Sequence, residues 1–167
     1  MGITDDICEP RYKFAKSKAQ ETFNFIPNND LPVDLESLAT ALGIILNPAD
    51  ITIDGLSRVD SNGTCLIVYS VAISDLRRRF TIAHELGHIL LEHISIGGDS
   101  SQISKGSQEK EANCFAGELL IPAKDIKKYF KENPNVTIDD IQKRYLVSKE
   151  AAFVAINGNR LLNKLSC

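Results

Sequence analysis

The five residues from 84 to 88, His-Glu-Leu-Gly-His, constrain this 167-residue chain more than any other feature of its sequence. Two histidines four residues apart lie about 40° from each other around an α-helix and one turn apart along it, so both rings can reach one ion. Glu85 lies about 100° from His84, at the edge of the same face, where its carboxylate can hold a water molecule without binding the ion. The spacing therefore predicts a helix that carries a metal site with His84 and His88 as ligands.

The flanking sequence agrees with a helix through this motif. Ser74 and Asp75 are good N-cap residues, and the pattern predicts a helix from about residue 76 to residue 91. Residues 95–107 then contain five serines and three glycines, which is typical of a loop. We expect this loop to be mobile and to gate the site. A second helix is predicted from about residue 108 to residue 120.

A catalytic zinc site takes three protein ligands and leaves one position open. The second helix offers three carboxylates, and Glu111 and Glu118 share one of its faces, two turns apart, while Glu109 lies about 160° from Glu111. This argument favours Glu111 as the third ligand, Glu118 as a carboxylate that supports the structure through hydrogen bonds, and Glu109 as a solvated surface charge. His93 projects about 180° from His84, so we expect a histidine at the helix end rather than a ligand.

The remaining pattern predicts an α+β fold in one domain, residues 1–167. Apolar periodicity predicts helices at about 10–23, 35–42 and 124–131, and two more within 138–162 that are broken near residues 146–148. A short strand is expected at 44–46, and residues 56–59 and 64–69 flank Asn62-Gly63 as a hairpin. The small, mostly antiparallel sheet should pack on the helix of the motif. Residues 120–167 form a helical C-terminal subregion that resembles a degenerate helix-turn-helix.

Charge and hydropathy limit the partners of the chain. The net charge is −3, and residues 138–164 carry five basic and three acidic side chains, a thin excess for holding phosphates. Direct binding of nucleic acid is therefore not expected. The sequence has no secretory signal and no apolar run of roughly 18 residues, so we expect no membrane partner and a cytoplasmic location.

Several stretches resemble the ImmA/IrrE family of gluzincin-like metallopeptidases. They are residues 31–39 (LPVDLESLA), 79–91 (RFTIAHELGHILL) and 111–122 (EANCFAGELLIP), with a weaker likeness in the tail from Val147 to Leu161. The resemblance implies a zincin-like minimal peptidase domain. It implies zinc, or manganese in its place, bound by His84, His88 and Glu111, with Glu85 as general base and acid. The partner it implies is a helix-turn-helix repressor of a phage, mobile element or stress regulon, which the protein cleaves or inactivates.

Two questions stay open at the level of sequence. Hydrolysis of a peptide needs a group that stabilises the oxyanion, and the candidates are Tyr69, Arg77, Arg79 and Tyr145. Two other functions compete with the peptidase: a non-catalytic, zinc-scaffolded protein that antagonises a repressor by binding it, and a DNA-binding regulator of the toxin–antitoxin type that uses the tail. The open coordination position and Glu85 favour the enzyme.

Overall fold

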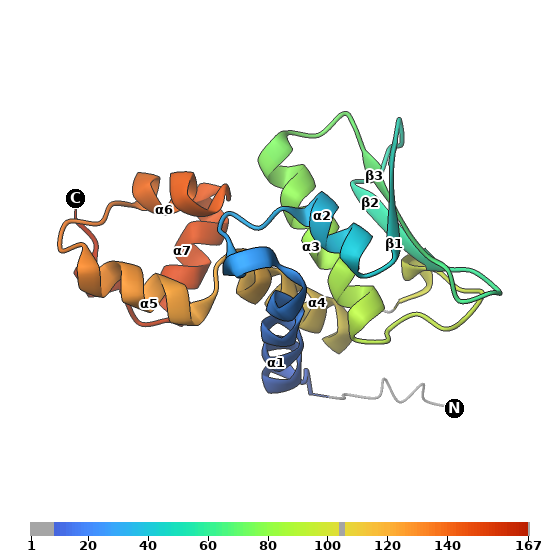
Figure 1. Cartoon of the computed structure of the whole chain (residues 1–167), viewed down its shortest axis with the longest axis horizontal. Helices are drawn as coiled ribbons and strands as arrows, with labels where there is room; N and C mark the ends of the chain where they lie inside the picture. Colours follow the sequence, from blue (N-terminus) through green and yellow to red (C-terminus); the bar gives the residue numbers. More distant parts are fainter. Residues whose placement is uncertain (1–8, 104–105, 167) are drawn as a thin grey trace, which may run out of the picture.

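The computed structural model describes residues 9–103 and 106–166. The fold is α+β, as the sequence predicts, with the sheet at one end of the molecule and a group of C-terminal helices at the other (Figure 1). The helices are α1 (Tyr12–Thr22), α2 (Leu35–Ala41), α3 (Asp75–Leu90), α4 (Ser107–Leu120), α5 (Ala123–Glu132), α6 (Ile138–Tyr145) and α7 (Lys149–Gly158). The strands are β1 (Ile44–Ala49), β2 (Gly55–Val59) and β3 (Cys65–Ser70).

The sheet has the strand order β1-β3-β2 and is mixed. The predicted hairpin is present, because β2 and β3 are antiparallel and the Asp60 carboxylate accepts hydrogen bonds from the backbone N–H groups of Asn62 and Thr64, both at 2.8 Å. In contrast, β1 runs parallel to β3 and extends to Ala49, further than the expected strand at 44–46. Pro48 is tolerated there because β1 is an edge strand.

Helix α3 connects the sheet to the other helices. It begins after Ser74, whose hydroxyl accepts a hydrogen bond from the backbone N–H of Arg77, and it packs against β2, β3 and α4. A Cβ atom on Gly87 would lie 3.2 Å from the Cα atom of Ala112 in α4. The lack of a side chain at Gly87 therefore allows α3 and α4 to approach closely at the place where the motif lies.

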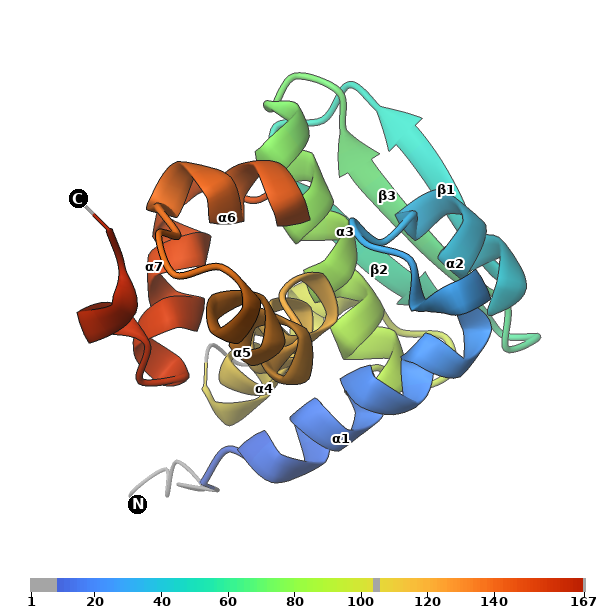
Figure 2. The same ribbon diagram turned by 60° about the vertical axis from the view of Figure 1, so that its left-hand side comes forward.

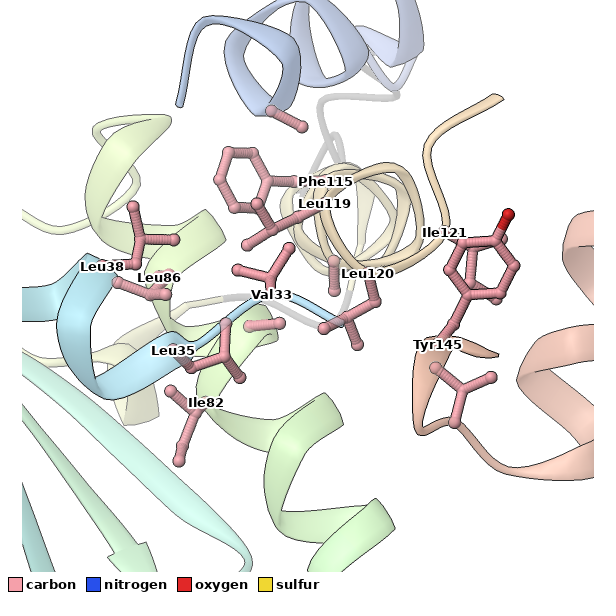
Figure 3. Close-up of a cluster of buried hydrophobic side chains, with 14 of the residues drawn as sticks. Val33, Leu35, Leu38, Ile82, Leu86, Phe115, Leu119, Leu120, Ile121 and Tyr145 are labelled. Carbon is pink, nitrogen blue, oxygen red and sulfur yellow. The ribbon is translucent and has the colours of Figure 1, made fainter. Parts of the chain in front are cut away.

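The main core lies where α2, α3 and α4 meet (Figure 3). Its buried side chains come from α2 and the residues just before it, from α3 and from α4: Val33, Leu35, Leu38, Ile82, Leu86, Phe115, Leu119 and Leu120. Because α3 and α4 both contribute to this core, packing fixes the position of the site that they share.

The C-terminal helices α5, α6 and α7 form a group of their own beside α3 and α4 (Figure 2). The hydroxyl of the fully buried Tyr145 donates a hydrogen bond of 2.6 Å to Asp125 of α5. Helix α6 ends at Tyr145 and is followed by Leu146, whose φ of 51° is left-handed, and Ser148 caps α7. The helical structure is therefore interrupted where the sequence predicts. Among the described residues, no helix combines the length and the apolar content that a membrane span needs.

Candidate metal centre

His84, His88 and Glu109 bring three potential ligand atoms together where α3 and α4 meet. The Nε2 atoms of the two histidines are 3.0 Å apart, and the Glu109 carboxylate oxygens lie 3.4 Å from His84 Nε2 and 3.2 Å from His88 Nε2. Ligand atoms that bind one tetrahedral zinc at about 2.0–2.1 Å are about 3.3 Å apart. The spacing and the chemistry of these three donors therefore fit a zinc ion.

The surroundings of His84 and His88 favour the form of each ring that can bind a metal through Nε2. His84 Nδ1 lies 3.0 Å from the side-chain oxygen of Asn113, which can only accept, so Nδ1 carries the proton and Nε2 keeps its lone pair. Burial, and then the nearby rings of His84 and His93, lower the pKa of His88 to about 3. A neutral imidazole with a free lone pair is the form that binds a metal.

The structure places Glu109, rather than the expected Glu111, beside the two histidines. The side chain of Glu109 is about one-third exposed and lies in the first turn of α4, in contact with both rings. Glu111 is turned toward α1, where Arg11 binds both of its carboxylate oxygens, and it also contacts His93. Hence Glu109 is not the isolated surface charge that the sequence suggested, and Glu111 is not part of the three-residue cluster.

The reason for this difference is that α4 has two buried faces. Glu111 lies on the face that packs on α1, whereas Glu109 precedes Ala112 by one turn on the face that meets Gly87 of α3. A helical wheel places residues on faces but does not say which face meets α3. The matching small residues Gly87 and Ala112 were the signal in the sequence that could have pointed to Glu109.

Glu85 lies beside the cluster, buried and held in place. Its Oε2 atom accepts a hydrogen bond of 2.5 Å from the hydroxyl of Ser57, a fully buried residue of β2 that the sequence did not single out. Glu85 and His84 line a pocket of about 260 Å³ together with Asp54, Gly55, Phe80, Thr81 and Asn113. A carboxylate, two imidazoles and a small open pocket are the parts that metal-assisted hydrolysis requires.

The segment after α3 lies along the outer edge of β2. The backbone N–H of Gly97 donates to the Val59 carbonyl at 2.8 Å, and the Val59 N–H donates to the Gly98 carbonyl at 3.1 Å. In addition, the Ser57 N–H donates to the hydroxyl of Ser100. This part of the expected loop, 95–107, is therefore attached to the sheet beside Ser57 rather than free, while residues 104–105 of that loop lie outside the described residues.

The four candidates for oxyanion stabilisation lie in different surroundings. Tyr145 is engaged with Asp125, and Arg79 donates to the backbone carbonyls of Val33 and Leu146. Tyr69 lines a separate groove between α2 and β1. Arg77 has a side-chain ion pair with a residue of the pocket, since its Nε lies 2.6 Å from a carboxylate oxygen of Asp54.

Glu118 lies at the other end of α4 and has a different set of partners. It accepts hydrogen bonds from the Gln20 side chain at 3.0 Å and from the Ala123 backbone N–H at 3.3 Å. Its carboxylate thus ties α4 to α1 and to the start of α5.

Comparison with known proteins identifies the family. Residues 39–157, well over half of the chain, match the Peptidase M78 family, described as the IrrE N-terminal-like domain. No protein with a curated description matches this chain. A solved structure described as a Mycobacterium tuberculosis transcriptional regulator has a similar fold, with a TM-score of 0.55 and 17% sequence identity. The match covers 84% of this chain and 45% of the regulator, so the chain spans less than half of that protein's length. The match over residues 39–157 shows that the chain belongs to the family of IrrE N-terminal-like peptidase domains.

Proposed function

We propose that the chain is a zinc-dependent endopeptidase in which His84, His88 and Glu109 hold the metal and Glu85 is the general base. The observation that carries this proposal is the convergence of three donor atoms beside a buried carboxylate that lines a pocket. Zinc, when bound, supplies a Lewis acid that polarises the scissile carbonyl and lowers the pKa of water. Manganese in the cell is compatible with the same donors.

The protein residues would then carry out the proton transfers. Glu85 takes a proton from the attacking water and donates it to the amine that leaves when the peptide bond breaks. Ser57 keeps the Glu85 carboxylate aimed at the pocket through its short hydrogen bond. Arg77 is the best placed of the candidates for oxyanion stabilisation because its partner, Asp54, lines the pocket.

The substrate that we propose is a repressor with a helix-turn-helix domain. The family resemblance supports it, and so does the similar structure, which is described as a transcriptional regulator. The C-terminal helices give little support to a DNA-binding role for the chain itself. Arg144 is committed to Asp125 at 2.9 Å, which leaves Lys143 and Lys149 as the exposed cations around the turn between α6 and α7.

Peptidase activity is tested with a library of peptides derived from a bacterial proteome. Zinc-loaded wild-type protein should create new peptide termini that mass spectrometry detects. Glu85→Gln should keep the zinc and the fold, because Glu85 is not a ligand and the change is nearly isosteric, yet create none of these termini. Equal cleavage by Glu85→Gln, or no cleavage by the wild type, would contradict the proposed activity.

The repressor as substrate is tested by co-expression with candidate helix-turn-helix repressors and a reporter gene. A gel reports the length of the repressor while the reporter reports its activity. We expect wild-type protein to shorten one repressor and relieve repression, and Glu85→Gln to do neither. If the wild-type protein relieves repression while the repressor keeps its full length, inactivation by binding is favoured. If only Lys143→Glu or Lys149→Glu abolishes the relief of repression, a DNA-binding regulator is favoured.

A further inference from the structure

A chain of hydrogen-bonded side chains runs from the metal centre to the N-terminal helix. His88 Nδ1 lies 3.0 Å from His93 Nδ1, and His93 Nε2 lies 3.1 Å from a carboxylate oxygen of Glu111. The other end of Glu111 is held by Arg11, which donates from its guanidinium to both carboxylate oxygens at 2.8–3.2 Å and from its backbone N–H at 2.9 Å. Four side chains from three segments of the chain are thus connected.

The direction of each hydrogen bond follows from the chemistry of the groups. A carboxylate only accepts, so His93 Nε2 donates to Glu111. The other nitrogen of a neutral His93 is then an acceptor, and His88 Nδ1 must donate to it. This arrangement leaves the lone pair of His88 on Nε2, the atom that lies beside His84 and Glu109.

The position of His93 depends on an unusual turn at the end of α3. Glu92 has a φ of 58°, in the left-handed region, and the backbone N–H of His93 donates a hydrogen bond of 2.9 Å to the carbonyl of His88. The N–H of Glu92 bonds the carbonyl of Ile89 at 3.1 Å, which completes a Schellman motif. This turn folds the His93 ring back onto His88, although the straight helix would place it on the opposite side.

Three of the four side chains are almost entirely removed from water. The side chains of His88 and His93 are each 1% exposed and that of Glu111 is 3% exposed, whereas that of Arg11 is 51% exposed. Buried polar groups are costly unless all of them are satisfied, and apolar side chains could fill the same space. A satisfied polar chain that ends on a metal ligand therefore points to a role at that ligand.

We propose that His93 and Glu111 are positioning residues for the metal ligand His88, and that Arg11 couples their arrangement to the docking of α1. This proposal rests on the metal site of the proposed function. His93 fixes the tautomer and the ring orientation of His88, Glu111 fixes His93, and Arg11 holds Glu111. None of the three belongs to the cluster of potential ligands formed by His84, His88 and Glu109.

The test measures metal binding, by the transfer of zinc from the protein to a chromogenic chelator and by the visible spectrum of the cobalt-substituted protein. His93→Leu should bind zinc roughly 10–100-fold more weakly and alter the cobalt spectrum, since a partner of a metal ligand is lost. His93→Asn should be weakened less, because its amide oxygen can accept from His88 in place of Nδ1. Glu111→Gln and Arg11→Ala should weaken zinc binding by smaller factors.

Gln20→Ala is the matched control, because Gln20 also joins α1 to α4, through Glu118, without reaching His88. It should lower the thermal stability of the zinc-free protein but leave zinc binding unchanged. Wild-type zinc affinity and cobalt spectrum in His93→Leu would overturn the proposal, as would equal weakening in Gln20→Ala and Arg11→Ala. Both readouts concern the metal, so they decide the role of His93 even for a protein that cuts no peptide. A wild-type protein that binds no zinc would overturn this proposal and the proposed function together.

Discussion

At the scale of single residues, the proposed chemistry depends most on the hydrogen bond from Ser57 to Glu85. A buried carboxylate has few positions that satisfy its oxygens, and a donor at 2.5 Å selects one of them. Since Ser57 is on β2 and Glu85 is on α3, the packing of the helix on the sheet sets the orientation of the proposed general base.

Ser57→Ala should lower kcat without removing zinc, since it frees Glu85 to turn away from the pocket. A hydrogen bond to a charged group contributes about 1.5–3 kcal/mol, which corresponds to a loss of roughly ten- to a hundred-fold in rate. Steady-state kinetics on a peptide that the wild type cleaves, with zinc content measured in parallel, checks this. Ser70→Ala removes another buried hydroxyl, one that donates to Ile51, and should leave kcat unchanged. Equal losses in both variants would count against a specific role for Ser57.

The pKa of Tyr145 provides a test of the C-terminal packing. Burial, followed by the hydrogen bond to Asp125, raises this pKa above its usual value near 10. An acid whose pKa is raised by folding adds stability below the pKa of the unfolded chain and loses it as pH rises through the folded value. The protein has four tyrosines and no tryptophan, so the tyrosinate absorbance is easily followed. The difference in tyrosinate absorbance between the wild type and Tyr145→Phe should titrate well above pH 10. A difference curve centred near pH 10 would contradict the buried Tyr145–Asp125 contact.

At the scale of elements, the approach of α3 to α4 decides where the proposed metal ligands meet. The two helices lie close together at Gly87, because a Cβ there would lie 3.2 Å from the backbone of Ala112 and from the ring of Phe115. Glu109 lies one turn from Ala112 on α4, and the two histidines flank Gly87 on α3. A small separation of the helices would therefore move Glu109 away from the rings.

Gly87→Ala should destabilise the protein by about 1–3 kcal/mol through overpacking and should weaken zinc binding. Gly117→Ala, in α4, is the control, because a Cβ at Gly117 meets nothing within 4 Å. There the higher helix propensity of alanine should add about 0.5–1 kcal/mol to the unfolding free energy, with zinc unaffected. Urea unfolding measures the change in stability, and competition with a chelator measures the zinc affinity. If Gly87→Ala matched the wild type in both stability and zinc affinity, the close contact at Gly87 would be contradicted.

The sequence predicted the elements better than their contacts. The α+β class, the motif helix, the hairpin and the break before α7 followed from local signals such as Asn62-Gly63 and the cap at Ser148. The parallel pairing of β1 and the choice between Glu109 and Glu111 depend on which surfaces meet, and local periodicity carries no such information. His93 was expected at a helix end, but its return to His88 requires a left-handed Glu92, a conformation that a non-glycine residue rarely adopts.

At the scale of the whole molecule, Arg79 joins the sheet-bearing part to the C-terminal helices. Its guanidinium donates to the carbonyl of Val33 at 2.9 Å, in the segment before α2, and to that of Leu146 at 3.2 Å, at the end of α6. Because Arg79 lies near the start of α3, the helix that carries the two histidines of the proposed metal site also anchors α6 and α7. This role is structural and differs from the oxyanion role considered at the start.

Arg79→Ala should lower the unfolding free energy by about 1–3 kcal/mol, because it leaves two carbonyls without their donor. Zinc content should not change. The comparison variant is Arg77→Ala, which is also on α3 and removes an exposed ion pair with Asp54. It should lower the unfolding free energy by at most about 1 kcal/mol. Thermal unfolding of the two variants, with amide exchange in α6 and α7, makes the comparison. Faster exchange in the C-terminal helices of Arg77→Ala than of Arg79→Ala would contradict this assignment.

The most direct test of the account is the zinc content of the protein purified without added chelator, measured by elemental analysis. We expect one zinc per chain in the wild type and in Glu111→Gln, which keeps the three donor side chains. We expect almost none in His84→Ala, His88→Ala and Glu109→Ala, each of which removes one of them. Full zinc in Glu109→Ala together with its loss in Glu111→Gln would contradict the metal centre described here.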